Sequence, residues 1–147
     1  MTPGQLRSRL ARRVAATGYP QSDSLIGPEG APRTIGPICW QLELTSATAL
    51  PTRQRSGSSD GLYMRWNIEL RVLATGNPAR RIDQWDAVLD AEAALRHALL
   101  QYVDGDGLDC VRNAIVFEAA DAPQYLDGGA YRLTTQRYHV SLTESLE

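Results

Sequence analysis

The chain has 147 residues, which is enough for a single domain to bury its own core without disulfides or metal ions. Its formal net charge is -2, and all fifteen cationic residues are Arg, so no overall basic field favours nucleic acid. The absence of Lys excludes a Schiff base and the phosphate-binding Lys of a P-loop. No apolar run has the length of a signal peptide or a membrane span, so we expect a soluble protein made in the cytoplasm, with no membrane partner.

The first residues predict a helix from Thr2 to about residue 16, followed by a terminating glycine at 18. Thr2 suits the N-cap, Pro3 the first helical position, and Gln5 the closing position of a capping box. The apolar stripe is narrow, and arginines fill the other positions: Arg7, Arg9, Arg12 and Arg13. We therefore expect a peripheral helix whose Arg cluster is either solvated or meets phosphate or an acidic partner.

A segment rich in Gly and Pro follows at 18–37, longer than an ordinary loop. It is either laid over the surface, with Leu25 and Ile26 as anchors, or ordered by a partner. The two cysteines, Cys39 and Cys110, lie in apolar runs, and buried reduced thiols are favoured over a disulfide.

The most regular pattern in the chain is the stretch 62–73, where every even position is apolar and the odd positions between them, 63 to 71, are polar or amphipathic. A period of two predicts a strand with one face in the core and one face in water. The stretch 38–45 shares this phase, so we expect the two to pair as a hairpin. The connection 46–61 carries Arg53 and Arg55 in a Ser/Gly-rich run, and we expect it to project as a long loop.

A core helix is predicted over 83–102, because apolar side chains recur on one broad stripe: Trp85, Val88, Leu89, Leu95, Leu99 and Tyr102. A third strand is predicted at about 110–119, a turn-rich segment at 120–129, and a last strand at 131–143. In the last strand the apolar residues change from odd to even positions, which predicts a β-bulge near 134–137.

The order α-β-β-α-β-β predicts one α+β domain over residues 1–147. Its natural form is a two-layer sandwich with a mainly antiparallel four-stranded sheet and the helices on one face.

No catalytic, cofactor or metal signature is convincing. Ser59 lies in a Gly-x-Ser-x-Gly pattern, but a nucleophile elbow needs a strand before it and a helix after it. Asp104 and Asp106 lack the Gly and Glu that complete a calcium loop. His97 and His139 have no ligand neighbours at metal-binding spacing. We therefore expect a protein that is not an enzyme.

Charge is unevenly distributed along the chain. The segment 83–127 carries ten acidic residues against two arginines, whereas the first helix is rich in Arg. This pattern is compatible with ordinary solubility, or with head-to-tail contact between copies in a ring.

Three stretches carry a family resemblance: the strand 62–73, the helix start Ile82-Asp83-Gln84-Trp85, and the last strand Tyr138-His139-Val140-Ser141-Leu142. In this order, with a peripheral first helix and an oversized hairpin loop, the chain resembles the tail terminator and tail-completion (minor tail) proteins of long-tailed bacteriophages. The resemblance implies a structural virion protein of the tail or neck, assembled in the host cytoplasm.

On this resemblance, the protein forms a ring, typically a hexamer, that caps the tail tube and joins it to a head-completion or connector protein. DNA would pass through its channel without specific binding, and the acidic segment would line that channel. The candidate interface residues are Arg53, Arg55, Arg65, Arg71, Arg9 and Arg13. The alternatives are another neck or head-completion protein, a small hydrolase using Ser59, and a nucleic-acid-binding module using the N-terminal arginines.

Overall fold

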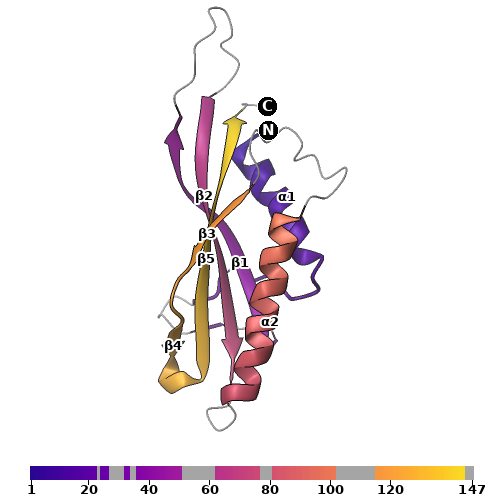
Figure 1. Ribbon diagram of the computed structural model, residues 1–147, viewed down its shortest axis with the longest axis vertical. Helices are drawn as coiled ribbons and strands as arrows, with labels where there is room; N and C mark the ends of the chain where they lie inside the picture. The colour runs from indigo at the N-terminus through magenta and orange to yellow at the C-terminus, as the bar shows by residue number, and fades with distance from the viewer. Residues whose placement is uncertain are drawn as a thin grey trace, which may run out of the picture.

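The structure is a computed structural model that describes residues 1–22, 24–26, 32–33, 36–50, 62–76, 81–101 and 115–144, with the backbone alone at 81–84. These residues form the helices α1 (Pro3–Ala15) and α2 (Arg81–Leu100), and the strands β1 (Ile38–Ala49), β2 (Leu62–Thr75), β3 (Val116–Ala120), β4 (Gln124–Leu126) and β5 (Tyr131–Glu144) (Figure 1). The sheet order is β1-β2-β5-β3, β4 also pairs with β5, and every pairing is antiparallel.

The predicted α+β class and antiparallel sheet are confirmed, with one strand more than the four predicted. The additional strand, β4, and a short 3-10 turn at Asp127–Gly129 lie in the segment predicted to contain only turns. Of the predicted third strand, residues 110–114 lie outside the described residues, and the strand is observed from Val116 onwards.

Helix α1 begins with the predicted capping box. The backbone N–H of Gln5 donates to Thr2 Oγ1 over 3.2 Å, and the Thr2 N–H donates to Gln5 Oε1 over 2.9 Å. Gly18 follows with φ +88°, the left-handed conformation that favours glycine.

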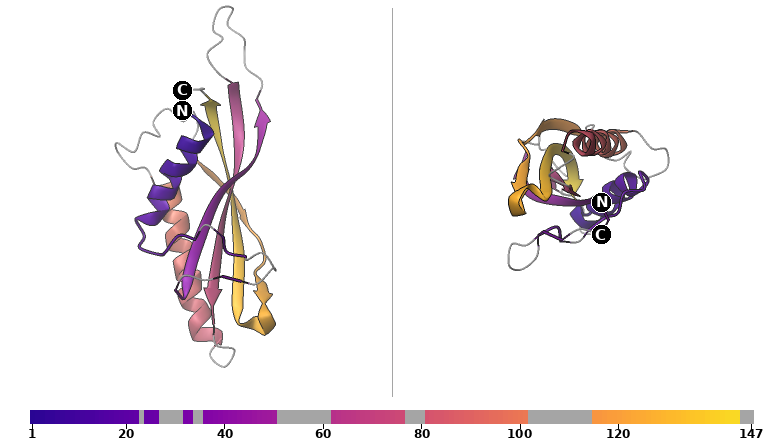
Figure 2. Two further views of the ribbon diagram at one scale, coloured as in Figure 1. Left: turned by 180° about the vertical axis from the view of Figure 1, so that it is seen from behind. Right: turned by 90° about the horizontal axis from the view of Figure 1, so that it is seen from below.

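The prediction that this helix is peripheral is wrong. Its four buried residues, Leu6, Leu10, Ala11 and Val14, belong to the main hydrophobic core. A narrow stripe at this spacing is enough to bury the helix, because α1 lies beside both α2 and the sheet (Figures 1 and 2), and its buried residues share one core with Trp40 of β1 and Leu95 of α2.

Helix α2 supplies the rest of the helical layer. Val88, Ala91, Leu95 and Leu99 are buried, and Leu95 and Leu99 belong to the main hydrophobic core with the sheet. Leu89 was predicted to share this stripe, but it is 51% exposed, because it lies about 100° around the helix from Val88.

The even positions of β1 and β2 form the sheet side of this core, as predicted. Trp40, Leu42, Ile68, Leu70 and Val72 are fully buried there. The predicted hairpin pairing is confirmed, with Leu42 opposite Leu70 and Trp40 opposite Val72.

Strand β1 is longer than predicted, so the predicted loop 46–61 is too long. A β-bulge between Leu44 and Ser46 shifts the register, and the pairing then continues to Ala49 opposite Met64. The Leu50 N–H also donates to the Tyr63 carbonyl over 2.9 Å. The sequence Ser-Ala-Thr-Ala carries no hydrophobic alternation, so its strand conformation comes from its hydrogen bonds to β2. Residues 51–61 lie outside the described residues.

The Gly/Pro-rich segment lies against the sheet, where the structure describes it. Gln21 forms an isolated parallel bridge with Trp40, and Leu25 is buried with Cys39 and Leu73 in a small second core on the other face of the sheet. Leu25 is therefore the anchor that the sequence predicted. Cys39 is a buried thiol as predicted, and Cys110 lies outside the described residues.

The prediction of a β-bulge in the last strand is wrong. The pairing of β5 with β2 runs without interruption from Leu62 opposite Glu144 to Thr75 opposite Tyr131, and the irregularity lies in β3 between Phe117 and Ala119. The even positions of β5 face the helices throughout. At one end they are apolar, and at the other they are the buried polar residues Arg132, Thr134 and Gln136.

These three polar side chains are satisfied by one residue of α2, Glu92. Arg132 forms an ion pair with the Glu92 carboxylate, Thr134 Oγ1 donates to it, and Gln136 Nε2 donates to the Glu92 carbonyl over 2.9 Å. The two charged side chains are only 8% and 9% exposed. A buried cluster of this kind is tolerated because each polar group has a partner.

We predict that Glu92→Ala lowers the free energy of unfolding by about 3–5 kcal/mol, because it leaves the Arg132 guanidinium buried without its counter-charge. Urea unfolding followed by circular dichroism measures this loss. Asp90→Ala, on the exposed side of the same helix, is the matched control and should stay within about 0.5 kcal/mol of wild type. Equal effects of the two changes would contradict this role for Glu92.

Candidate functional site: the polar face of the sheet

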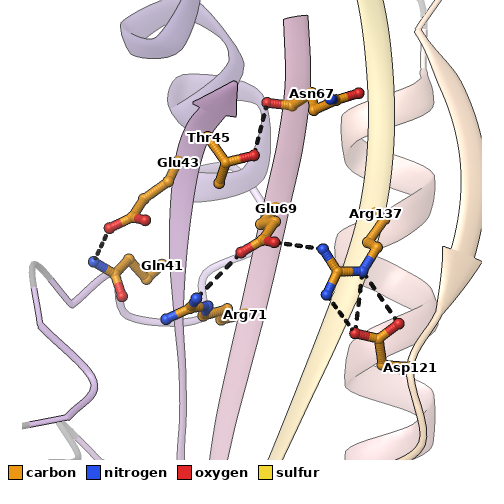
Figure 3. A network of polar contacts seen from close by, with 8 residues as sticks. All are labelled: Gln41, Glu43, Thr45, Asn67, Glu69, Arg71, Asp121 and Arg137. Carbon is orange, nitrogen blue, oxygen red and sulfur yellow. Dashed lines mark hydrogen bonds and ion pairs between the residues drawn. The ribbon is translucent and has the colours of Figure 1, made fainter. Parts of the chain in front are cut away.

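Side chains at odd positions of β2 and β5 lie on the face of the sheet turned away from the two helices, because successive side chains of a strand alternate. We call this surface the polar face. It is defined by residues on β1, β2, β5 and β3 and just beyond β3: Gln41, Glu43, Asn67, Glu69, Arg71, Arg65, Arg137, His139, Glu118 and Asp121. Figure 3 shows the central part of its network.

Glu69 is the centre of this network. Arg71 Nη2 lies 3.2 Å from Glu69 Oε2 on one side, and Arg137 donates to Glu69 Oε1 on the other (Figure 3). Glu43 is the residue directly opposite Glu69 on β1, an arrangement of like charges that is unfavourable by itself. The two guanidiniums and the Gln41 amide, which donates to Glu43 Oε1 over 2.8 Å, offset that repulsion.

Arg137 connects Glu69 to Asp121. Its Nη2 lies 2.7 Å from Asp121 Oδ2, and its Nε lies 3.1 Å from the same oxygen. The hydrogen bond from Arg137 lowers the pKa of Asp121, and hydrogen bonds to Asp121 and Glu69 raise the pKa of Arg137. This guanidinium is therefore held as a cation between two carboxylates.

A second group lies further along the same face. Arg65 Nη2 lies 2.8 Å from Glu118 Oε1, and His139 Nδ1 lies 2.5 Å from the same oxygen. The hydrogen bond to His139, followed by that to Arg65, lowers the pKa of Glu118. Beside this group, the Asn67 amide donates to Ser46 Oγ over 2.8 Å.

The polar face is therefore charged and largely self-neutralised. Its three guanidiniums, Arg65, Arg71 and Arg137, each form an ion pair with a carboxylate of the same face. Four carboxylates accompany them: Glu43, Glu69, Glu118 and Asp121. Such a surface is suited to contact with water or a polar partner rather than to holding a single anion.

The predicted site residues fall on different sides of the molecule. Arg65 and Arg71 belong to the polar face. Arg9 and Arg13 lie on the helical layer, where they line a hollow of about 410 Å³ between α1 and α2 together with Arg12 and His97. Arg13 Nη1 also donates to the Leu99 carbonyl over 3.2 Å. Arg53 and Arg55 lie outside the described residues.

Four charged or ionisable residues of the polar face were not among the predicted interface residues: Glu118, Asp121, Arg137 and His139. Glu118 and Asp121 were assigned only to the acidic segment. The expected change of phase near 134–137 hid Arg137 and His139, because the odd positions of β5 from 135 to 143 are polar in one continuous series. The acidic segment 83–127 is also not one acidic surface. Glu92 is buried in an ion pair, while Glu118 and Asp121 are paired with arginines of the polar face.

Within the described part of the chain, no group of three or more His, Cys, Asp or Glu residues is arranged to hold a metal ion. The helices described there include none that is long and apolar enough to cross a membrane. Ser59, the nucleophile of the hydrolase alternative, lies outside the described residues.

Comparison with solved structures finds a chain of the same fold in the structure described as "Virion of native gene transfer agent (GTA) particle". The match covers 95% of this chain and 96% of that chain, with a TM-score of 0.56 and 13% sequence identity. The chain shares its fold with a virion component. No protein-family model and no curated protein sequence matches it.

We predict that His139→Ala raises the pKa of Glu118 towards its ordinary range, because the largest cause of the lowered value is the hydrogen bond to His139. A carboxyl-carbon NMR titration measures this directly. Since folding lowers the pKa of Glu118, its stabilising contribution is present above the unfolded pKa and is lost as the pH falls through the folded value. The acid-induced loss of stability below about pH 4 should therefore be smaller in the variant.

Thr143→Ala, an exposed position further along the same strand, is the control and should leave the pKa of Glu118 unchanged. An unaltered Glu118 titration in His139→Ala would rule out the hydrogen bond to His139 as the main cause of the lowered pKa.

Proposed function

We propose that this chain is a structural virion protein, a tail terminator that forms a ring, caps the completed tail tube and joins it to the head. The fold likeness to a chain of a virion, extending over almost the whole of both chains, is the observation that carries the proposal. The stretches that resemble tail terminators, around 62–73, 82–85 and 138–142, lie in β2, α2 and β5, the central elements of that fold.

The polar face supports a role in which DNA passes close by without being retained. Non-specific DNA binding depends on cationic side chains that displace counterions from phosphates. The guanidiniums of this face are held by Glu69, Glu118 and Asp121, and the carboxylates outnumber them. We therefore propose that the polar face is turned towards the channel of the ring and the helical layer away from it.

The proposal of a terminator is tested by purifying the chain and measuring its mass by light scattering, with electron microscopy of the particles. We expect rings with about six times the mass of the 16.2 kDa chain, bound to the ends of purified tail tubes. Binding to portal-bearing heads but not to tubes would favour the alternative neck or head-completion role. A strict monomer that binds neither would overturn both.

Arg53 and Arg55 remain the proposed contacts of the hairpin loop with the tube. We predict that Arg53→Ala with Arg55→Ala weakens tube binding about tenfold or more while ring formation is kept, because it removes two charged hydrogen-bond donors from the contact. Pelleting of tubes with bound protein measures the effect. Arg33→Ala, an exposed arginine elsewhere in the chain, is the matched control. Unchanged tube binding by the double variant would remove the loop from the proposal.

The role of the polar face leads to a separate prediction. The double variant Glu69→Gln with Asp121→Asn should bind a short DNA duplex non-specifically at about 50 mM salt, because both carboxylates that hold Arg137 are neutralised. This binding should be much weaker at about 200 mM salt. Fluorescence anisotropy of labelled duplex measures it, and wild type should not bind.

Asp86→Asn with Asp90→Asn, which makes the same change of charge on the exposed side of α2, is the control. Equal binding by both double variants would show that net charge alone, rather than this face, governs the effect. The same assay tests the nucleic-acid alternative, since salt-sensitive binding by wild type would support it.

A further inference from the structure

Strand β1 forms one edge of the sheet, and the described residues of the chain cover only part of that edge. Trp40 is paired outwards: its N–H donates to the Pro20 carbonyl over 3.1 Å, and its carbonyl accepts from the Ser22 N–H over 2.8 Å. The next outward carbonyl, that of Leu42, accepts from Arg7 Nε over 3.1 Å. In the first half of the edge, the segment after α1 therefore pairs with Trp40, and one arginine binds the carbonyl of Leu42.

The second half of the edge presents backbone groups outwards. Leu50 donates inwards to Tyr63, so by alternation the N–H of Thr48 also points to β2, and those of Ala47 and Ala49 point away from the sheet. Within the described part of the chain, neither outward N–H has a hydrogen-bond partner across this edge.

Among the described residues, this half of the edge also has none of the features by which proteins protect an open strand. Edge strands are normally guarded by charged side chains, by Pro or by a covering element. Residues 45–49 are Thr-Ser-Ala-Thr-Ala, without a charge or a proline, and four of the five are exposed. A small, uncharged and accessible edge of this kind is suited to receive another strand.

The other edge of the sheet is β3. It pairs with β5 on one side, most of its residues are exposed, and Val116 is 42% exposed. The register across the sheet places the open part of β1 and the start of β3 at the same level. Ser46 pairs with Asn67, Asn67 pairs with His139, and His139 pairs with Val116.

The directions of the two edges make them complementary. The order β1-β2-β5-β3 contains three antiparallel steps, so β1 and β3 run in opposite directions. Rotation about a ring axis that follows the strands keeps strand direction unchanged. The β3 edge of one copy therefore meets the β1 edge of the next in antiparallel orientation. Such a heterologous contact closes into a ring when the rotation allows it.

We propose that copies of this chain join by strand addition, with residues 44–49 of β1 pairing with β3 of the neighbouring copy and continuing the sheet around the ring. This inference rests on the proposed ring and names its contact surface. It places the polar faces of all copies on one side of a continuous sheet and their helices on the other.

Ala47→Pro tests the pairing. Proline removes the outward N–H and places its ring where the neighbouring strand would lie, while an edge position facing away from the sheet tolerates it. We expect a folded variant, with unchanged circular dichroism, that remains monomeric under conditions in which wild type forms rings. Ala47→Ser keeps the N–H and should assemble as wild type does. Normal rings formed by Ala47→Pro would overturn the proposal.

Hydrogen exchange of the wild-type protein gives a test that does not depend on the folding of a variant. On assembly, the Ala47 amide should exchange at least about tenfold more slowly, whereas the Thr48 amide should be protected in both monomer and ring. Rings with an unprotected Ala47 amide would overturn the edge pairing but leave the terminator proposal intact. A wild-type chain that stays a monomer, or that stops at a two-fold dimer through β1, would overturn the edge pairing. If that chain also failed to bind tail tubes, the terminator proposal would be overturned too.

Discussion

The continuous antiparallel register between β2 and β5 is the constraint on which the rest of the structure depends. All 14 residues of β2 have a partner in β5. Because side chains alternate between faces, a shift of one residue would place Glu69 and Arg71 under the helices and Ile68 and Leu70 in water. The register therefore decides at once which surface packs against α1 and α2 and which becomes the polar face.

The two faces of the sheet use ion pairs for different physical purposes. The Glu92–Arg132 pair is buried, and its charges have lost most of their contact with water, so the cost of desolvation offsets much of their attraction while the pair connects α2 to β5. In the pairs around Glu69 and Glu118 the guanidiniums are 40–44% exposed, although Glu69 itself is only 13% exposed. Ion pairs with an exposed partner contribute roughly 0–1 kcal/mol each. Their main consequence is electrostatic, since they hold three guanidiniums in fixed contact with carboxylates.

The β-bulge near Thr45 links the covered and the open halves of the β1 edge. Before the bulge, Trp40 and Leu42 place large side chains in the core, and other parts of the chain bind the outward N–H and carbonyl of Trp40 and the outward carbonyl of Leu42. After it, the phase of the strand is reversed, and small residues continue the pairing with β2. A single strand thus contributes to the core at one end, and at the other end it presents an edge that no other described residue covers.

The sequence by itself determined the features that depend on neighbouring residues. The capping box of Thr2 and Gln5, the hairpin of β1 and β2, and the buried even positions such as Ile68 and Leu70 all follow from spacing along the chain. Only the tertiary structure decided the burial of α1, the length of β1 and the phase of β5. Thr134 and Gln136 are buried because Glu92, more than forty residues earlier, satisfies their hydrogen bonds, and no local pattern of hydrophobicity reports a partner so distant. For the same reason Arg137, Glu118 and Asp121 joined the polar face only once three strands were in register.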